Sequence, residues 1–187
     1  MQLVLIRHQA PQVAPGICYG RTDLDVLPAE LHETLEQLVT QLHPLPNQLA
    51  IVSSPLQRCL KLAQALSARW ALPAVQIDED LAEMAFGRWE MQPWSAIARE
   101  EIDAWAAQPV HYSPGGGENV LALASRIQLL LRRLRQTGQD RILVCHAGPI
   151  RILHALAQND DLTDAAAAAV AGPHHMAYGS LVRLHFD

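Results

Sequence analysis

The sequence has little of what several broad classes of protein require. Its 187 residues include only three cysteines, Cys18, Cys59 and Cys145, which lie far apart and form no CxxC pair. This pattern indicates reduced thiols and excludes a disulfide framework. Positive charge is also scarce, since 14 Lys and Arg against 19 Asp and Glu leave a net charge of −5. A general nucleic-acid binder would carry a basic patch or stripe, so we expect no nucleic-acid partner.

Long apolar runs are missing as well. A strand is predicted almost from Met1, with no charged-then-apolar leader before it, and no apolar stretch has the length of a membrane-spanning helix. We therefore expect a cytoplasmic protein without a membrane partner. Half of the residues are hydrophobic, which excludes a disordered chain and favours one domain over residues 1–187. The oligomeric state stays open between a monomer and a homodimer.

Short apolar runs alternate with stretches of helical periodicity, which predicts an α/β fold: a three-layer α/β/α sandwich with a mainly parallel sheet. Strands are expected at residues 3–6, 49–52, 74–77, 141–145 and 181–186, and helices at about 29–42, 54–70, 118–136, 148–157 and 164–171. The segment at about 78–117 differs, because it holds three of the four tryptophans and ends in three consecutive glycines. We interpret it as a helical excursion that forms a pocket wall.

Two of the predicted strands end in a histidine. Arg7 and His8 follow the apolar run at residues 3–6, and His146 follows the run at 141–145. Open α/β sheets place their ligand sites at the carboxyl ends of strands. Two imidazoles delivered to one sheet edge, with an arginine beside the first, indicate phosphoryl chemistry with His8 as the nucleophile.

Cleavage of a phosphate ester through a phosphohistidine needs a neutral imidazole, cations around the nonbridging oxygens and an acid for the leaving alkoxide. Arg7 and Arg58 can supply forked donors that match a phosphate, and nearby cations disfavour the imidazolium form of His8. His146 can stabilise the transferring group. The helix that opens at Gly148 would direct free backbone N–H groups to the same place.

The acid is predicted to be Glu83, a carboxyl flanked by apolar and aromatic residues, which favours the protonated form that a donor needs. Glu90 is the second candidate. No metal site is expected: His174-His175 has no further ligand at suitable spacing, and Gly115-Gly116-Gly117 lacks the lysine and hydroxyl of a phosphate-binding P-loop.

Four motifs occur in a fixed order: Leu5-Ile6-Arg7-His8, Ser53-Ser54-Pro55-Leu56-Gln57-Arg58, Leu81-Ala82-Glu83 with Phe86-Gly87-Arg88-Trp89-Glu90, and His146-Ala147-Gly148-Pro149-Ile150-Arg151. This order resembles the histidine phosphatase superfamily, whose fold is phosphoglycerate-mutase-like. The resemblance implies a phosphorylated nucleophile at His8 and a phosphate pocket completed by Arg7, Arg58 and His146. It also implies Glu83 as the proton donor, a small phosphorylated substrate, and no metal or organic cofactor.

The loop Gly16-Ile17-Cys18-Tyr19-Gly20-Arg21-Thr22-Asp23-Leu24-Asp25-Val26 is most similar to the α-ribazole phosphatase branch. That branch acts on a nucleotide-like intermediate of cobalamin synthesis. The resemblance implies substrate contacts from Arg21 and Thr22. The sequence leaves the physiological substrate open.

Two departures from the family pattern keep alternatives open. Gln9 stands where the family usually has glycine, and a backbone with positive φ there would disfavour it. An inactive module that binds phosphorylated ligands is therefore one alternative. A phosphoglycerate mutase is the other, although the loop asparagine common in mutases has no equivalent near Ala14 and the chain is compact.

Overall fold

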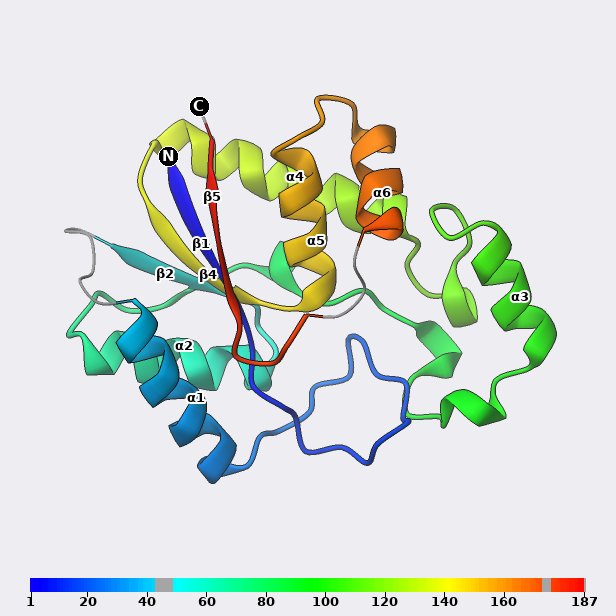
Figure 1. Ribbon diagram of the computed structural model, residues 1–187, viewed down its shortest axis with the longest axis horizontal. Coiled ribbons are helices and arrows are strands. Elements are labelled where there is room, and N and C mark those ends of the chain that lie inside the picture. Colours follow the sequence, from blue (N-terminus) through cyan, green and yellow to red (C-terminus); the bar gives the residue numbers. More distant parts are fainter. Residues whose placement is uncertain (43–48, 173–175, 187) are drawn as a thin grey trace.

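The computed structural model describes residues 1–42, 49–172 and 176–186. It contains one five-stranded sheet with the strand order β3-β2-β4-β1-β5 (Figure 1). The strands are β1 (Gln2–Arg7), β2 (Ala50–Ser53), β3 (Gln76–Ile77), β4 (Arg141–Cys145) and β5 (Leu181–His185). All neighbouring strands are parallel except β1 and β5, which are antiparallel. The prediction of a mainly parallel sheet is therefore confirmed.

Helices cover both faces of the sheet, as the three-layer prediction requires. The helices are α1 (Pro28–Gln41), α2 (Gln57–Arg69), α3 (Arg99–Ala107), α4 (Val120–Thr137), α5 (Ala147–Leu156) and α6 (Leu162–Ala171). Val4 and Ile6 of β1 pack with buried side chains of α1 and α2, whereas Leu3 and Leu5 pack with those of α4, α5 and α6. Successive side chains of a strand point to opposite faces, so β1 contributes to both cores.

The local sequence explains where several helices begin. Asn119 caps α4 by accepting a hydrogen bond from the Ala122 N–H, and Asp161 caps α6 by accepting from Thr163 and Asp164. The predicted start of α2 at Ser54-Pro55 is wrong, because the helix begins at Gln57. Ser54 lies before the helix, where its hydroxyl contacts His146 and accepts from the Leu56 N–H, and Leu56 is the N-cap residue.

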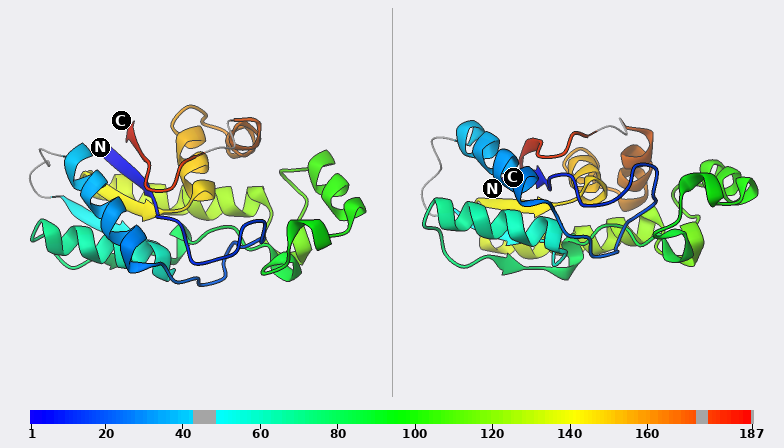
Figure 2. Two further views of the ribbon diagram at one scale, coloured as in Figure 1. Left: turned by 60° about the horizontal axis from the view of Figure 1, so that its bottom comes forward. Right: turned by 90° about the horizontal axis from the view of Figure 1, so that it is seen from below.

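Residues 78–117 leave the sheet and extend to one end of the molecule, where α3 lies in both figures (Figures 1 and 2). Besides α3, the segment consists of short 3₁₀ turns at Glu79–Leu81, Gly87–Trp89, Trp94–Ala96 and Pro114–Gly116. Trp89 is 1% exposed at the centre of a small separate core that also contains Cys18 and Ile97. The segment thus has its own apolar centre beside the loop that follows β1.

The loop after β1 is tied to this segment by backbone hydrogen bonds. Cys18 N–H donates to the Gln92 carbonyl at 2.8 Å, and Met91 N–H donates back to the Cys18 carbonyl at 2.8 Å. Trp94 N–H donates to the Gly16 carbonyl at 2.9 Å. Within the described ranges, no helix combines the length and the apolar character needed to cross a bilayer.

Candidate active site

His8 lies immediately after β1 and is 2% exposed. Its Nδ1 lies 2.5 Å from the Gln9 carbonyl oxygen. A carbonyl can only accept, so Nδ1 carries the proton and Nε2 keeps a free lone pair. Burial, followed by the positive charges of Arg58 and Arg7, holds the pKa of His8 well below its usual range, although the Gln9 hydrogen bond opposes this. The imidazole is therefore neutral at neutral pH, as a nucleophile must be.

His146 lies beside His8 because β1 and β4 are neighbours. Arg7 pairs with Cys145 in the parallel register, so the two histidines follow their strands at the same level. Their ring centroids are 5.0 Å apart. The side chain of His146 is fully buried, and its Nε2 lies 2.8 Å from the Ser54 hydroxyl. Burial keeps the pKa of His146 well below its usual range, and repulsion from His8 when that ring is protonated, and from the Arg58 guanidinium, adds to it.

Arg58 is fully buried in the first turn of α2 and connects three parts of the site. Its Nε donates to His146 Nδ1 at 3.3 Å. Its Nη1 donates to the Thr22 carbonyl at 2.7 Å, and its Nη2 donates to the Gly20 carbonyl at 2.5 Å. The same guanidinium therefore places a positive charge next to both histidines and holds the loop at residues 20–22.

Arg7 and two tyrosines form the other side of the site. The Arg7 guanidinium lies 4.1 Å from the ring centroid of Tyr178 and donates to the Met176 carbonyl, while its buried Nε has no hydrogen-bond partner among the described residues. The Tyr178 and His8 ring centroids are 5.6 Å apart. The Tyr178 hydroxyl lies 2.6 Å from the Tyr19 hydroxyl, and the Tyr19 ring lies 5.5 Å from the Arg58 guanidinium. Each tyrosine thus contacts one arginine of the site.

The Glu83 carboxylate lies against the first turn of α5, which follows His146. One carboxylate oxygen accepts from Gly148 N–H at 3.2 Å, and the other accepts from Met84 N–H at 3.0 Å. A Cβ atom at position 148 would lie 2.2 Å from Glu83 Oε1, so glycine is required for this contact. The Gly148 N–H was predicted to bind substrate. The structure directs it to Glu83, and a substrate contact from it stays a prediction.

Glu90 is engaged in holding the loop. Its carboxylate accepts from the N–H groups of Arg21 at 2.9 Å, Thr22 at 2.6 Å and Phe86 at 2.9 Å, and also from the Thr22 hydroxyl. Burial raises the pKa of Glu90, but these hydrogen bonds more than offset it, and the net pKa is lowered. A lowered pKa is unsuited to a proton donor at neutral pH, which leaves Glu83 as the better candidate.

The predicted substrate contacts of Arg21 and Thr22 remain predictions. The side chain of Arg21 is exposed, and the Thr22 hydroxyl already donates to Glu90. Both residues belong to the loop that Arg58 holds, so the loop itself borders the site.

A pocket of about 570 Å³ opens beside Glu83. Most of its walls are apolar, and they come from the excursion, from α4 and α5, and from the end of α6. The lining residues include Phe86, Ile102, Trp105, Val120, Leu123, Ile152 and Val170. Tyr19, Glu83 and Gly148 line the same pocket, so it adjoins the predicted proton donor, whereas His8, His146 and the two arginines of the site are not among its lining residues.

Gln9, the departure from the family pattern, fits its position in the backbone. Ala71 and Met91 are the described non-glycine residues with positive φ, and Gln9 is not one of them. Its side chain is fully buried, and within the part of the chain that the structure describes neither its Oε1 nor its Nε2 has a hydrogen-bond partner. The strain that would have argued for an inactive site is absent at this residue.

Metal ligands do not gather in the described part of the chain: it holds no group of three or more His, Cys, Asp and Glu side chains placed to bind an ion. His174-His175 lies outside the described residues. Sequence reasoning missed Ser54 as a partner of His146, and Tyr19 and Tyr178 as neighbours of the arginines. A hydroxyl directly before Pro55 was the available signal for Ser54, whereas no local pattern pointed to Tyr178.

Comparisons with known proteins identify relatives of the chain in sequence and in fold. The family described as histidine phosphatase superfamily (branch 1) matches residues 3–187. The chain is 32% identical over 160 residues to the adenosylcobalamin/alpha-ribazole phosphatase of Escherichia coli K12, which covers 83% of this chain and 78% of that protein. The alpha-ribazole phosphatase structure from Shigella flexneri has a TM-score of 0.85 at 25% identity, covering 100% of this chain and 91% of that chain.

A mycobacterial glucosyl-3-phosphoglycerate phosphatase is similar in fold. Its native structure gives a TM-score of 0.82 at 24% identity and covers 97% of this chain and 88% of that chain.

Proposed function

Because the chain belongs to branch 1 of the histidine phosphatase superfamily and is a phosphatase, we propose that it hydrolyses a small phosphate monoester through a covalent phosphohistidine on His8. The observation that carries this proposal is the neutral imidazole of His8. Its Nδ1 donates to the Gln9 carbonyl, and its ring packs beside that of His146. Arg58 Nε in turn donates to His146 Nδ1. A neutral imidazole with a fixed tautomer, next to cations, suits attack on phosphorus.

The first step transfers the phosphoryl group to the enzyme. The lone pair of His8 Nε2 forms the new N–P bond while the bond from phosphorus to the ester oxygen breaks. Arg7, Arg58 and His146 surround the nonbridging oxygens and stabilise their charge. Glu83 delivers its proton to the departing oxygen, so the product leaves as an alcohol.

The second step releases phosphate. Water attacks the phosphorus of phosphohistidine while the Glu83 carboxylate takes up one of its protons. The N–P bond breaks, its electron pair returns to Nε2, and inorganic phosphate leaves. Glu83 thus acts first as acid and then as base, and both groups end in their starting states.

The substrate we propose is a nucleotide-like ester such as α-ribazole 5′-phosphate. Two observations support it: the identity of 32% to the Escherichia coli adenosylcobalamin/alpha-ribazole phosphatase, and the apolar pocket next to Glu83. A pocket that adjoins the proton donor would receive the leaving group. Phe86 and Trp105 on its walls suit an aromatic base better than a sugar or a short acid.

Trapping the intermediate tests the proposal. Substrate labelled in its phosphate group is mixed with enzyme in a single turnover and quenched in alkali, where phosphohistidine survives. We expect acid-labile label on the peptide that contains His8 and none in His8→Ala, whose turnover falls by about 10⁴-fold or more. His154→Ala, an exposed histidine of α5, is the matched control.

Label on a different residue would contradict the nucleophile assignment. A panel of α-ribazole 5′-phosphate, glucosyl-3-phosphoglycerate, 3-phosphoglycerate and p-nitrophenyl phosphate then tests the substrate, with the highest kcat/KM expected for the first. Isomerisation of 3-phosphoglycerate faster than phosphate release would instead favour a mutase.

A further inference from the structure

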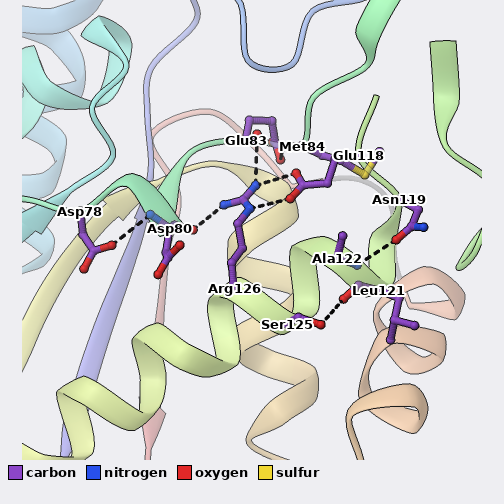
Figure 3. Close-up of polar contacts among 10 residues, drawn as sticks. All are labelled: Asp78, Asp80, Glu83, Met84, Glu118, Asn119, Leu121, Ala122, Ser125 and Arg126. Atoms are coloured by element: carbon purple, nitrogen blue, oxygen red, sulfur yellow. Dashed lines mark hydrogen bonds and ion pairs between the residues drawn. The ribbon is translucent and has the colours of Figure 1, made fainter. Parts of the chain in front are cut away.

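Arg126 of α4 forms a mostly buried ion pair near Glu83. Its side chain is 13% exposed, and that of its partner Glu118 is 14% exposed. Arg126 Nε donates to Glu118 Oε1 at 2.7 Å, and Nη2 donates to Glu118 Oε2 at 2.9 Å (Figure 3). This two-point contact fixes the plane of the guanidinium.

The remaining donors of Arg126 reach the backbone of the excursion. Nη1 donates to the Asp80 carbonyl, and Nη2 donates to the Glu83 carbonyl at 3.2 Å (Figure 3). One guanidinium therefore joins α4 to the two ends of a short backbone stretch that includes the predicted proton donor. Since Gly148 and Met84 hold the carboxylate of the same residue, Glu83 is held at both its backbone and its side chain.

We propose that Arg126, oriented by Glu118, is a positioning residue that sets where the Glu83 carboxyl meets the leaving-group oxygen. This inference rests on the proposed function, because it takes Glu83 to be the acid. Arg126 contacts Glu83 only through the backbone carbonyl, so it acts through Glu83 and not on the substrate. A lysine at this position could not make the two-point contact with Glu118 and also reach both carbonyls.

A second arginine on the same helix offers a matched control. Arg133 donates to the carboxylates of Asp78 and Asp80 at 2.8 to 3.1 Å, so it also ties α4 to the start of the excursion. Its side chain is 50% exposed, and it makes no contact with Glu83 among the described hydrogen bonds. Arg133→Gln therefore weakens the same attachment of α4 without releasing the acid.

The dependence of activity on the leaving group distinguishes a positioning role of Arg126 from a purely structural one, which would affect all esters equally. Benzyl phosphate releases benzyl alcohol, a poor leaving group that needs a proton from the acid. Dinitrophenyl phosphate releases dinitrophenolate, which leaves without a proton. Both esters carry one aromatic ring, so they are similar in bulk. For Arg126→Gln we expect kcat/KM to fall about 10²-fold on benzyl phosphate and less than about 3-fold on dinitrophenyl phosphate. Glu83→Gln should show the same pattern, and Arg133→Gln should match the wild type on both.

Arg126→Gln leaves the Glu118 charge without its partner, which can prevent folding. The double variant Glu118→Gln/Arg126→Gln removes both charges, and the shorter glutamine at position 126 still cannot reach the Glu83 carbonyl. It should fold, as checked by circular dichroism and thermal melting, and keep the selective loss on benzyl phosphate.

Equal losses on both esters, or no loss on benzyl phosphate in the folded double variant, would overturn the positioning role. If Glu83→Gln itself lacks the selective loss, or the wild type forms no phosphohistidine, the proposed function fails instead. The two failures are therefore distinguishable.

Discussion

The polar centre around His8 and the apolar pocket beside it are built in opposite ways. The centre draws its side chains from the ends of β1 and β4 and from the segment that follows β2, and its polar groups bind one another. The pocket is lined mainly by side chains from helices and from the excursion, with few polar atoms. The predicted catalytic groups are thus placed by the ends of strands, whereas the shape of the pocket is set by the excursion and by α4, α5 and α6.

Arg58→Lys should damage the centre most. Lysine keeps the charge but cannot reach His146, Gly20 and Thr22 together, so we expect kcat/KM to fall about 10²- to 10³-fold for every ester tested. The exposed Arg69→Lys at the other end of α2 is the control. A loss of activity confined to large aromatic esters would contradict this division between centre and pocket, because it would mean that Arg58 helps to select the substrate.

Gly148→Ala tests the border between the two regions. The new Cβ would meet Glu83 Oε1 at 2.2 Å, and the carboxylate, as the end of a flexible side chain, would move away. We expect about a 10- to 10²-fold loss of kcat/KM with little change in thermal stability. Gly172→Ala is the control, since of the described atoms its Cβ would meet only the Ala168 carbonyl oxygen, at 3.4 Å. Full activity would show that the carboxylate position is not critical.

Val170→Ser changes the pocket alone. It replaces the two methyl groups of valine in the wall with one hydroxyl, so KM for naphthyl phosphate should rise about 3- to 10-fold. KM and kcat for glycerol phosphate, which does not fill the pocket, should stay the same. Leu129→Ser, an exposed position on α4, controls for a general effect of lost apolar surface. Equal changes for both esters would argue that the pocket is not the leaving-group site.

Between pH 7 and 5, stability should depend on pH mainly through the two buried histidines of the centre. His8 and His146 are buried with lowered pKa values, so below about pH 6.5 the unfolded chain takes up protons that the folded protein does not. The free energy of unfolding should therefore fall on acidification by about 1.4 kcal/mol per pH unit for each histidine. Urea titrations between pH 7 and 5 measure this slope. His8→Asn should reduce it and the exposed His154→Asn should not; identical slopes would contradict the account.

The sheet and most helices could be predicted because apolar periodicity is a local property of the sequence. The same applies to His8 and His146, which follow apolar strands directly, and to Arg58 through its motif. The start of α2 could not be predicted, because Ser54 binds an imidazole 92 residues away instead of starting the helix.

Long-range contacts between side chains account for what the sequence did not reveal. Tyr19 and Tyr178 meet across 159 residues, and Tyr178 lies in an irregular loop without periodicity. Glu90 was a candidate acid on local grounds, but its hydrogen bonds to Arg21 and Thr22 come from a loop about 70 residues earlier. Such contacts depend on how distant segments pack, which no local pattern encodes.

The pairing of β1 has a consequence for biosynthesis. This strand is made first, yet its partners in the sheet are β4 and β5, the last strands to leave the ribosome. Contacts this distant along the chain slow folding, and an apolar segment that waits for its partners is exposed to aggregation. The predicted nucleophile would therefore be synthesised well before β4 and β5 are available to complete the sheet around it.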